Sequence, residues 1–180
     1  VLMLTLLNLK RHMLAVVAVA VVAWLIVFPQ INRWSNSLFY VQLYDLPAGT
    51  STLYTGYSAH QKIDLLETPE GARVLFLDGL THFGSQDNRW LNVVMGEIPG
   101  ALMLPDEVLV LGAGAMQLER ELANFADHVT TVEIDSVVVD VSLEYLTDYN
   151  RMDTLDNRTI IIDDAKHFIA NDDATYDLIA

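Results

Sequence analysis

The stretch Glu107–Met116, EVLVLGAGAM in one-letter code, decides the fold of this chain. Four apolar residues after Glu107 are typical of a short buried β-strand. Gly112 then permits a tight turn, and Gly114, which lacks a Cβ, lets a ligand approach the backbone. The helix predicted after this turn would offer unpaired N–H groups to a polar ligand. The third glycine of the dinucleotide pattern is absent, and an ordinary strand-to-helix turn remains an alternative.

Apolar runs of strand length alternate with amphipathic helical segments after this turn. Strands separated by helices of about ten residues indicate parallel βαβ units. The fold class is therefore α/β, with a Rossmann-like parallel sheet in a domain at residues 105–180. An open sheet of this kind needs five or more strands, so we expect it to be truncated at Ala180. The predicted strands are 107–111, 129–134, 158–162 and 176–180, and the predicted helices are 116–125, 137–146 and 165–170.

Acidic residues end the second and third predicted strands. Glu133 stands 21 residues after Gly112, the spacing at which a carboxylate accepts hydrogen bonds from both ribose hydroxyls of a bound nucleotide. Asp163 and Asp164 follow the third strand, where one carboxylate could take an adenine amino group and the other could cap the next helix. Together with the glycine turn, these residues predict a nucleoside site at one edge of the sheet.

The preceding segment, residues 34–104, is predicted to hold a linker, a small β-hairpin module and a connecting helix. Residues 62–67 and 73–77 have β-like patterns and flank the turn signal Thr68-Pro69-Glu70-Gly71. The helix predicted over residues 88–104 contains Pro99-Gly100, and we expect it to break there.

The N-terminal domain, residues 1–33, is predicted to be a membrane segment. Residues 13–28 are 16 consecutive apolar residues, and no charge appears until Arg33, a length about sufficient to cross a bilayer core. A signal peptide and a buried core helix are the alternatives, but no small-x-small cleavage site follows. We expect an inner or plasma membrane location with the soluble domain in the cytoplasm. The positive-inside bias of Lys10 and Arg11 would instead place the acidic domain outside after a single crossing, so the orientation stays open.

Composition limits the classes of partner. The formal net charge is −14, and all 24 acidic residues follow residue 28. Such a charge repels nucleic acid phosphates, so no nucleic-acid binding is expected, whereas a cationic substrate would be attracted. The absence of cysteine excludes disulfides and zinc–thiolate sites. The histidines show no metal-ligand spacing, and we expect no metal.

Four short motifs resemble those of one enzyme family. Residues 58–63, SAHQKI, resemble its Tyr-Gln-x-Ile opening, and Leu77-Asp78-Gly79 matches its hairpin end. Val132-Glu133-Ile134-Asp135 and Asp164-Ala165 match its ribose and adenine motifs. Over about residues 54–180 the chain resembles S-adenosylmethionine-dependent methyltransferases in general and, more closely, the spermidine synthase family of polyamine aminopropyltransferases. Its membrane segment is similar to that of membrane-fused members.

The resemblance implies a methyltransferase-type fold and a transferase that uses decarboxylated S-adenosylmethionine, or S-adenosylmethionine itself, as substrate. A small cationic amine such as a polyamine would be the acceptor, a catalytic Asp would lie beyond Ala180, and a homodimer is a further expectation. Asp135 could instead support the loop. The residues implied to bind the nucleoside are Gln61, Gly112, Ala113, Gly114, Glu133, Ile134, Asp135, Asp164 and Ala165.

Several residues depart from the pattern of that family. Ala115 stands where an Asp is expected to hold the amino group of the ligand, and Met116 replaces a glycine. Trp90-Leu91-Asn92 replaces Tyr-His-Glu, and His82 stands in place of a Gln. Three functions therefore remain open: an aminopropyltransferase, a divergent methyltransferase that uses the same pocket, and a membrane-tethered binding domain without catalysis.

Overall fold

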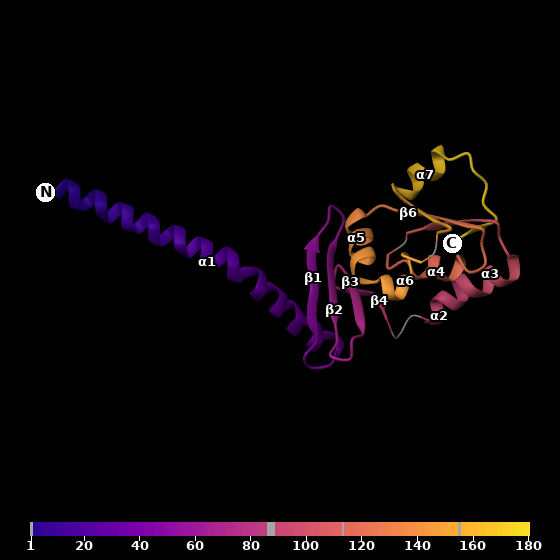
Figure 1. The fold of residues 1–180 in the computed structure, drawn as a ribbon, viewed down its shortest axis with the longest axis horizontal. Coiled ribbons are helices and arrows are strands. Elements are labelled where there is room, and N and C mark those ends of the chain that lie inside the picture. Colours follow the sequence, from indigo (N-terminus) through magenta and orange to yellow (C-terminus); the bar gives the residue numbers. More distant parts are fainter. Residues whose placement is uncertain (1, 86–88, 113, 155) are drawn as a thin grey trace.

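A computed structural model describes residues 2–85, 89–112, 114–154 and 156–180 (Figure 1). A long helix, α1 (Leu2–Tyr44), extends away from the rest of the molecule and has the N-terminus at its far end. Residues 12–30 of this helix are exposed, and Pro29 lies inside it. The segment His12–Tyr44 is long and apolar enough to cross a membrane, and an 18-residue window within it has a mean hydropathy of 2.5.

The C-terminal end of α1 packs against an antiparallel sheet. Tyr40 is 1% exposed and stacks on Phe76 with ring centroids 4.1 Å apart. The Tyr40 hydroxyl donates a hydrogen bond of 2.6 Å to Asp64 Oδ2, and Lys62 Nζ lies 2.8 Å from the same oxygen. A single helix, α1, therefore runs from the exposed apolar segment to the contact with the antiparallel sheet. The domain boundary predicted at residue 33 falls inside this helix.

The predicted hairpin is the centre of a larger sheet. Its two strands have the predicted bounds, but a strand is added on either side, so the order is β1-β2-β3-β4 with every pair antiparallel. Residues 29–57 have no clear strand pattern, and for this reason the sequence does not predict β1. The four strands are β1 (Ser51–Tyr57), β2 (Lys62–Glu67), β3 (Arg73–Leu77) and β4 (Leu80–Gly84).

The connecting helix does not break where the sequence predicts. It comprises α2 (Arg89–Asn92), a π-helical turn η1 (Val93–Glu97) and α3 (Ile98–Met103). Pro99 lies in the first turn of α3, directly after the π-helical turn, and the helical path continues through it. Gly100 is buried because the Phe125 ring occupies the space that a Cβ would need.

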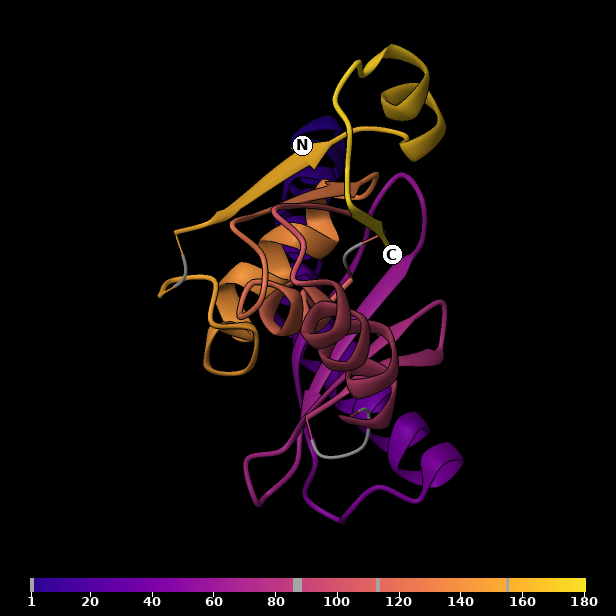
Figure 2. The same cartoon turned by 90° about the vertical axis from the view of Figure 1, so that its right-hand side faces the viewer.

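The parallel sheet confirms the α/β prediction. Its strand order is β7-β6-β5-β8, and β5, β6, β7 and β8 run parallel. Figure 2 shows the yellow C-terminal segment leaving the sheet through α7 (Ala165–Asn171) and returning to it at β8. The strands are β5 (Glu107–Leu111), β6 (His128–Glu133), β7 (Arg158–Ile162) and β8 (Leu178–Ile179), and the other helices are α4 (Gln117–Leu122), α5 (Ser136–Tyr145) and α6 (Thr147–Asn150).

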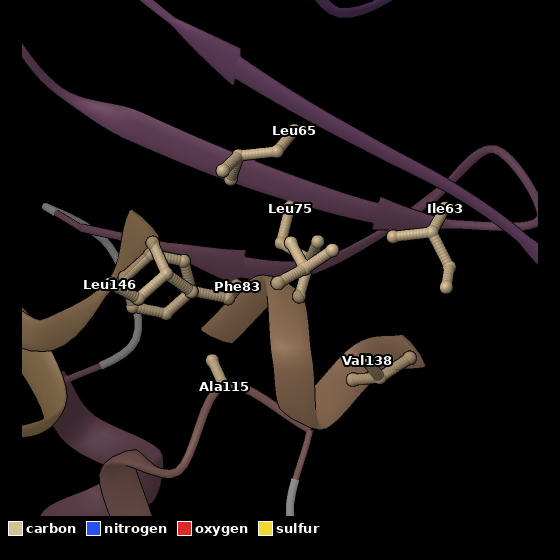
Figure 3. Close-up of a cluster of buried hydrophobic side chains, with 8 residues drawn as sticks. Ile63, Leu65, Leu75, Phe83, Ala115, Val138 and Leu146 are labelled. Atoms are coloured by element: carbon tan, nitrogen blue, oxygen red, sulfur yellow. The ribbon is translucent and has the colours of Figure 1, made fainter. Parts of the chain in front are cut away.

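One hydrophobic cluster joins the two sheets (Figure 3). Leu65, Leu75 and Phe83 of the antiparallel sheet pack against Ala115 of the glycine turn and Val138 of α5, and all five side chains are buried. Burial of such side chains stabilises by roughly 1.5–3 kcal/mol for each large residue. The cluster therefore fixes the glycine turn against the upstream module, and the predicted site lies where the two sheets meet.

Candidate functional site

The glycine turn leaves β5 with the backbone geometry that its sequence predicts. Gly112 has φ +89° and Gly114 has φ +50°, a region in which a Cβ is strained. The Gly112 N–H donates to the Val132 carbonyl at 2.9 Å, which ties the turn to β6. Ala113, between the two glycines, lies outside the described residues. Met116 also has a left-handed backbone, with φ +61°, and its side chain is fully buried.

Glu133 ends β6 beside this turn, and its carboxylate is held by backbone amides. Oε2 accepts a hydrogen bond of 3.2 Å from the Gly114 N–H, and Oε1 accepts one of 3.0 Å from the Asp135 N–H. The residue is 8% exposed. A carboxylate oxygen has two lone-pair positions and can accept more than one hydrogen bond. The group is thus oriented in advance for a ligand that donates two hydroxyls.

A cavity of about 470 Å³ opens at this point, between the glycine turn and the antiparallel sheet. Its volume falls in the range typical of small-molecule sites, roughly 300–1,000 Å³. Gln61, Gly112, Gly114 and Glu133 all line it, so the fold gathers four of the implied binding residues from two separate sheets. The remaining lining residues are Leu77, Leu80, Thr81, His82 and Val138.

Asp135 has a structural position beside the cavity. Its Oδ2 accepts from Ser58 Oγ at 2.6 Å and from Gln61 Nε2 at 3.0 Å, while its Oδ1 caps α5 through the Val137 N–H at 3.1 Å. Burial acts to raise the pKa of this carboxyl, but the hydrogen bonds outweigh burial and lower it. Asp135 therefore joins the loop that holds Ser58 and Gln61 to the start of α5, and it holds Gln61 at the cavity.

The other implied residues lie outside the cavity lining. Asp164 caps α7, because its Oδ1 accepts from the backbone N–H groups of Lys166 and His167 at 2.8 and 3.1 Å. Ala165 is the first residue of that helix, and the Ile134 side chain is 44% exposed. One aspartate, Asp164, is thus the helix cap, and Asp163 Oδ2 lies 2.8 Å from Nδ1 of the His167 ring. The contact of a carboxylate with the adenine amino group stays a prediction.

No group of three or more His, Cys, Asp or Glu side chains within the described ranges could hold a metal ion. The polar groups that line the cavity are the Glu133 carboxylate, the Gln61 amide, the His82 imidazole, the Thr81 hydroxyl and the backbone of the glycine turn. These groups suit a nucleoside ligand bearing ribose hydroxyls.

Comparisons with known proteins identify the family. The Spermine/spermidine synthase domain profile matches residues 91–180, half of the chain. The chain belongs to the spermine/spermidine synthase family. Polyamine aminopropyltransferases of Streptococcus uberis and Alkaliphilus oremlandii are 31% and 33% identical to it, each over 130 residues, 71% of this chain and 46% of the relative. The chain thus spans about half the length of the curated relatives it matches.

Solved structures of family members share the fold. Spermidine synthase from Thermotoga maritima superimposes with a TM-score of 0.65 at 25% identity, over 71% of this chain and 45% of that protein. A spermidine synthase in complex with the transition-state analogue AdoDATO gives the same TM-score and identity, and 46% of that protein is covered. These matches confirm the α/β fold with a parallel sheet like that of spermidine synthase.

Among the lining residues that the sequence analysis did not place in the site, His82 is the ionisable one. In the β3–β4 pairing, Phe76 faces Thr81 and Leu75 faces Phe83, so His82 is the extra residue of a β-bulge. Bulges redirect side chains and are frequent beside active sites. The sequence signal for a site role of His82 is its position in the family pattern, where a Gln is expected. The bulge itself has no local sequence signature.

The His82 imidazole lies directly on the glycine turn. A Cβ built on Gly114 would overlap His82 Nε2, so a larger residue there would force the imidazole to move. Although the residue as a whole is exposed, loss of solvation around the ring lowers its pKa below 6.5, and the nearby Glu133 carboxylate acts in the opposite direction. The lowered pKa favours the neutral form of the imidazole.

Proposed function

We propose that this chain carries the nucleoside-binding part of an aminopropyltransferase, with decarboxylated S-adenosylmethionine as the donor and a small cationic amine as the acceptor. The observation that carries the proposal is the Glu133 carboxylate, held by two backbone amides at a cavity that Gln61 and the glycine turn also line. Family membership supports the reaction type. The related spermidine synthase bound to AdoDATO supports a donor of the adenosyl class.

Each part of the cavity has a task in this proposal. Glu133 accepts hydrogen bonds from the two ribose hydroxyls, while Gly112 and Gly114 let the ligand approach the backbone of the turn. Gln61, fixed by Asp135, supplies an amide to the polar part of the ligand. The net charge of −14 attracts a cationic amine over a long range. In this proposal, residues 105–180 are the nucleoside-binding domain.

We further propose that α1 anchors the protein in a membrane through residues 13–28, with the soluble part on the cytoplasmic side where adenosyl nucleosides occur. The apolar side chains of this segment are exposed, for example Trp24 at 58% and Ile26 at 66%, as expected for contact with lipid. Recovery of the protein in the membrane fraction after alkaline carbonate extraction supports this anchor. Release into the supernatant would contradict it.

Isothermal titration calorimetry of the full-length protein tests the nucleoside site. Decarboxylated S-adenosylmethionine should bind more tightly than S-adenosylmethionine, and methylthioadenosine should bind as a product. Glu133→Ala should weaken binding by about 1–3 kcal/mol, because two hydrogen bonds to a charged acceptor are lost. This corresponds to roughly 5- to 150-fold in Kd.

Glu70→Ala is the matched control, because Glu70 carries the same charge in an exposed turn away from the cavity. Circular dichroism verifies that both variants fold. Unchanged affinity in folded Glu133→Ala would contradict the ribose assignment. Tighter binding of S-adenosylmethionine than of its decarboxylated form would favour a methyltransferase, and no binding of any of the three would exclude the nucleoside site.

A further inference from the structure

A second, smaller cavity adjoins the nucleoside cavity. Its volume is about 200 Å³, below the roughly 300–1,000 Å³ of a site that encloses a whole ligand, so it suits one part of a reactant. His82 and Gly112 line both cavities, and the second cavity therefore begins at the glycine turn. The side chains that make its wall apolar are Phe83, Leu91, Met95, Ala115 and Leu118.

Close packing between η1 and α4 holds this wall in place. Gly96 of η1 is buried, and a Cβ built on it would lie 2.9 Å from the Cβ of Glu121 in α4. A larger residue at this position would therefore push the two helices apart. Their close contact brings Met95 of η1 and Leu118 of α4 to the same cavity, and π-helical turns such as η1 are frequent at functional sites.

Two amide side chains complete the lining. Asn92 and Gln117 line both the second cavity and a neighbouring polar cavity of about 430 Å³, so they lie between the two. Asn92 Nδ2 donates a hydrogen bond of 2.9 Å to Gln117 Oε1. Within the part of the second lining that the structure describes, there is no Asp, Glu, Lys or Arg side chain. An ammonium group placed against this lining would lose hydration without gaining a carboxylate from it.

Two departures from the family pattern lie in this lining. Leu91 stands where the pattern has His, and Asn92 stands where it has Glu. A polyamine carries a second ammonium along its chain, and replacement of the Glu removes a carboxylate that could pair with that charge. The changes therefore make the cavity more suitable for an uncharged carbon chain.

We propose that the second cavity binds the apolar tail of the acceptor, so that the preferred acceptor is a primary monoamine with a short alkyl tail. This inference rests on the proposed aminopropyl transfer and narrows its acceptor class. The amine nitrogen lies at the glycine turn, beside the nucleoside cavity, and the carbon chain extends along the wall that Phe83 and Met95 form. Each methylene group that the wall removes from water strengthens binding by about fourfold.

Isothermal titration calorimetry of the full-length protein saturated with methylthioadenosine tests the inference without requiring turnover. The two amines compared are pentylamine and putrescine, which have equal numbers of non-hydrogen atoms and differ in one end group, a methyl against an ammonium. Pentylamine should bind about 10-fold more tightly or better, because the wall accepts a methyl group and disfavours a second charge. With decarboxylated S-adenosylmethionine as donor, kcat/KM should show the same order.

A charged variant locates the tail. Met95→Glu should shift the ratio of the two affinities toward putrescine by roughly 10-fold, because it removes apolar wall and adds a carboxylate that can pair with the second ammonium. Met103→Glu is the matched control, since Met103 is a partly exposed methionine of the following helix, at 52% against 40% for Met95, and does not line the cavity. This control should leave the ratio unchanged.

The outcomes separate the inference from the proposed function. Putrescine that binds as tightly as pentylamine, or equal shifts in Met95→Glu and Met103→Glu, would overturn the assignment of the tail and leave the nucleoside site in place. A methylthioadenosine complex that binds neither amine would overturn the assignment in the same way. Failure of the wild type to bind methylthioadenosine would overturn the proposed function, and this inference with it.

Discussion

The buried carboxyl of Glu119 should make the free energy of unfolding depend on pH. It lies in the first turn of α4, is 1% exposed and faces β6, where Thr131 Oγ1 donates to its Oε1 at 3.3 Å. Among the described residues, its Oε2 and the Arg158 Nε are buried side-chain atoms without a hydrogen-bond partner. Burial raises the pKa of Glu119 to about 7, opposed mainly by hydrogen bonds and the Arg158 charge.

The size of this pH dependence follows from the shift in the pKa of Glu119. The pKa rises from 4.5 to about 7 on folding, and each pKa unit corresponds to about 1.4 kcal/mol. Between these values the folded state binds more protons than the unfolded state, so the free energy of unfolding falls as pH rises. The contribution of Glu119 should therefore be fully present below pH 4.5 and smaller by about 3 kcal/mol above pH 7.

Glu119→Gln removes this titration. The new amide group adds a buried donor, which costs about 1–3 kcal/mol, but that cost is the same at every pH. Urea unfolding of wild type and variant, followed by circular dichroism in detergent, should show the variant gaining about 3 kcal/mol relative to wild type from pH 5 to 8. Glu70→Gln, in an exposed turn, should show no such change. A pH-independent difference for Glu119→Gln would refute the reasoning.

Two further substitutions test the junction between the sheets. Asp135→Ala should lower the free energy of unfolding by roughly 2–4 kcal/mol at pH 7, because it removes a helix cap and leaves two donors without their acceptor. Because the pKa of Asp135 is lowered in the folded state, the stability advantage of the wild type should disappear as acid protonates this carboxyl. Matching unfolding curves of variant and wild type at pH 7 would contradict the stabilising role of Asp135. Gly114→Ala should destabilise more than Gly71→Ala, since both have positive φ but only Gly114 contacts His82; equal melting temperatures would exclude that contact.

Local pattern predicts the nucleoside half of the fold well. The apolar run before Gly112, the spacing to Glu133 and the alternation of strands and helices depend on residues close in sequence. The four parallel strands accordingly lie within two residues of their predicted bounds. Gly112, Gly114 and Glu133 also meet at one cavity, because the carboxyl ends of adjacent parallel strands share one edge of the sheet.

Features that depend on tertiary contacts escaped prediction. The helix α1 continues to Tyr44 because Tyr40 stacks on Phe76, a residue 36 positions later in the chain. The strand β4 has little alternation, since Thr81 and His82 are both exposed and the bulge breaks its period. The two aspartates after β7 each had two plausible roles, and only the geometry shows that Asp164 is the helix cap.

The departures from the family pattern form one connected set in the structure. Ala115 is 6% exposed inside the cluster that joins the sheets, where an aspartate would be a buried charge among Leu75 and Phe83. With alanine at this position, Phe83 can pack closely, and the bulge beside it sets the His82 imidazole on Gly114. The two departures, Ala115 and His82, are thus physically linked. The same packing of Phe83 against Ala115 leaves no place for a carboxylate in the turn and brings the His82 imidazole to it.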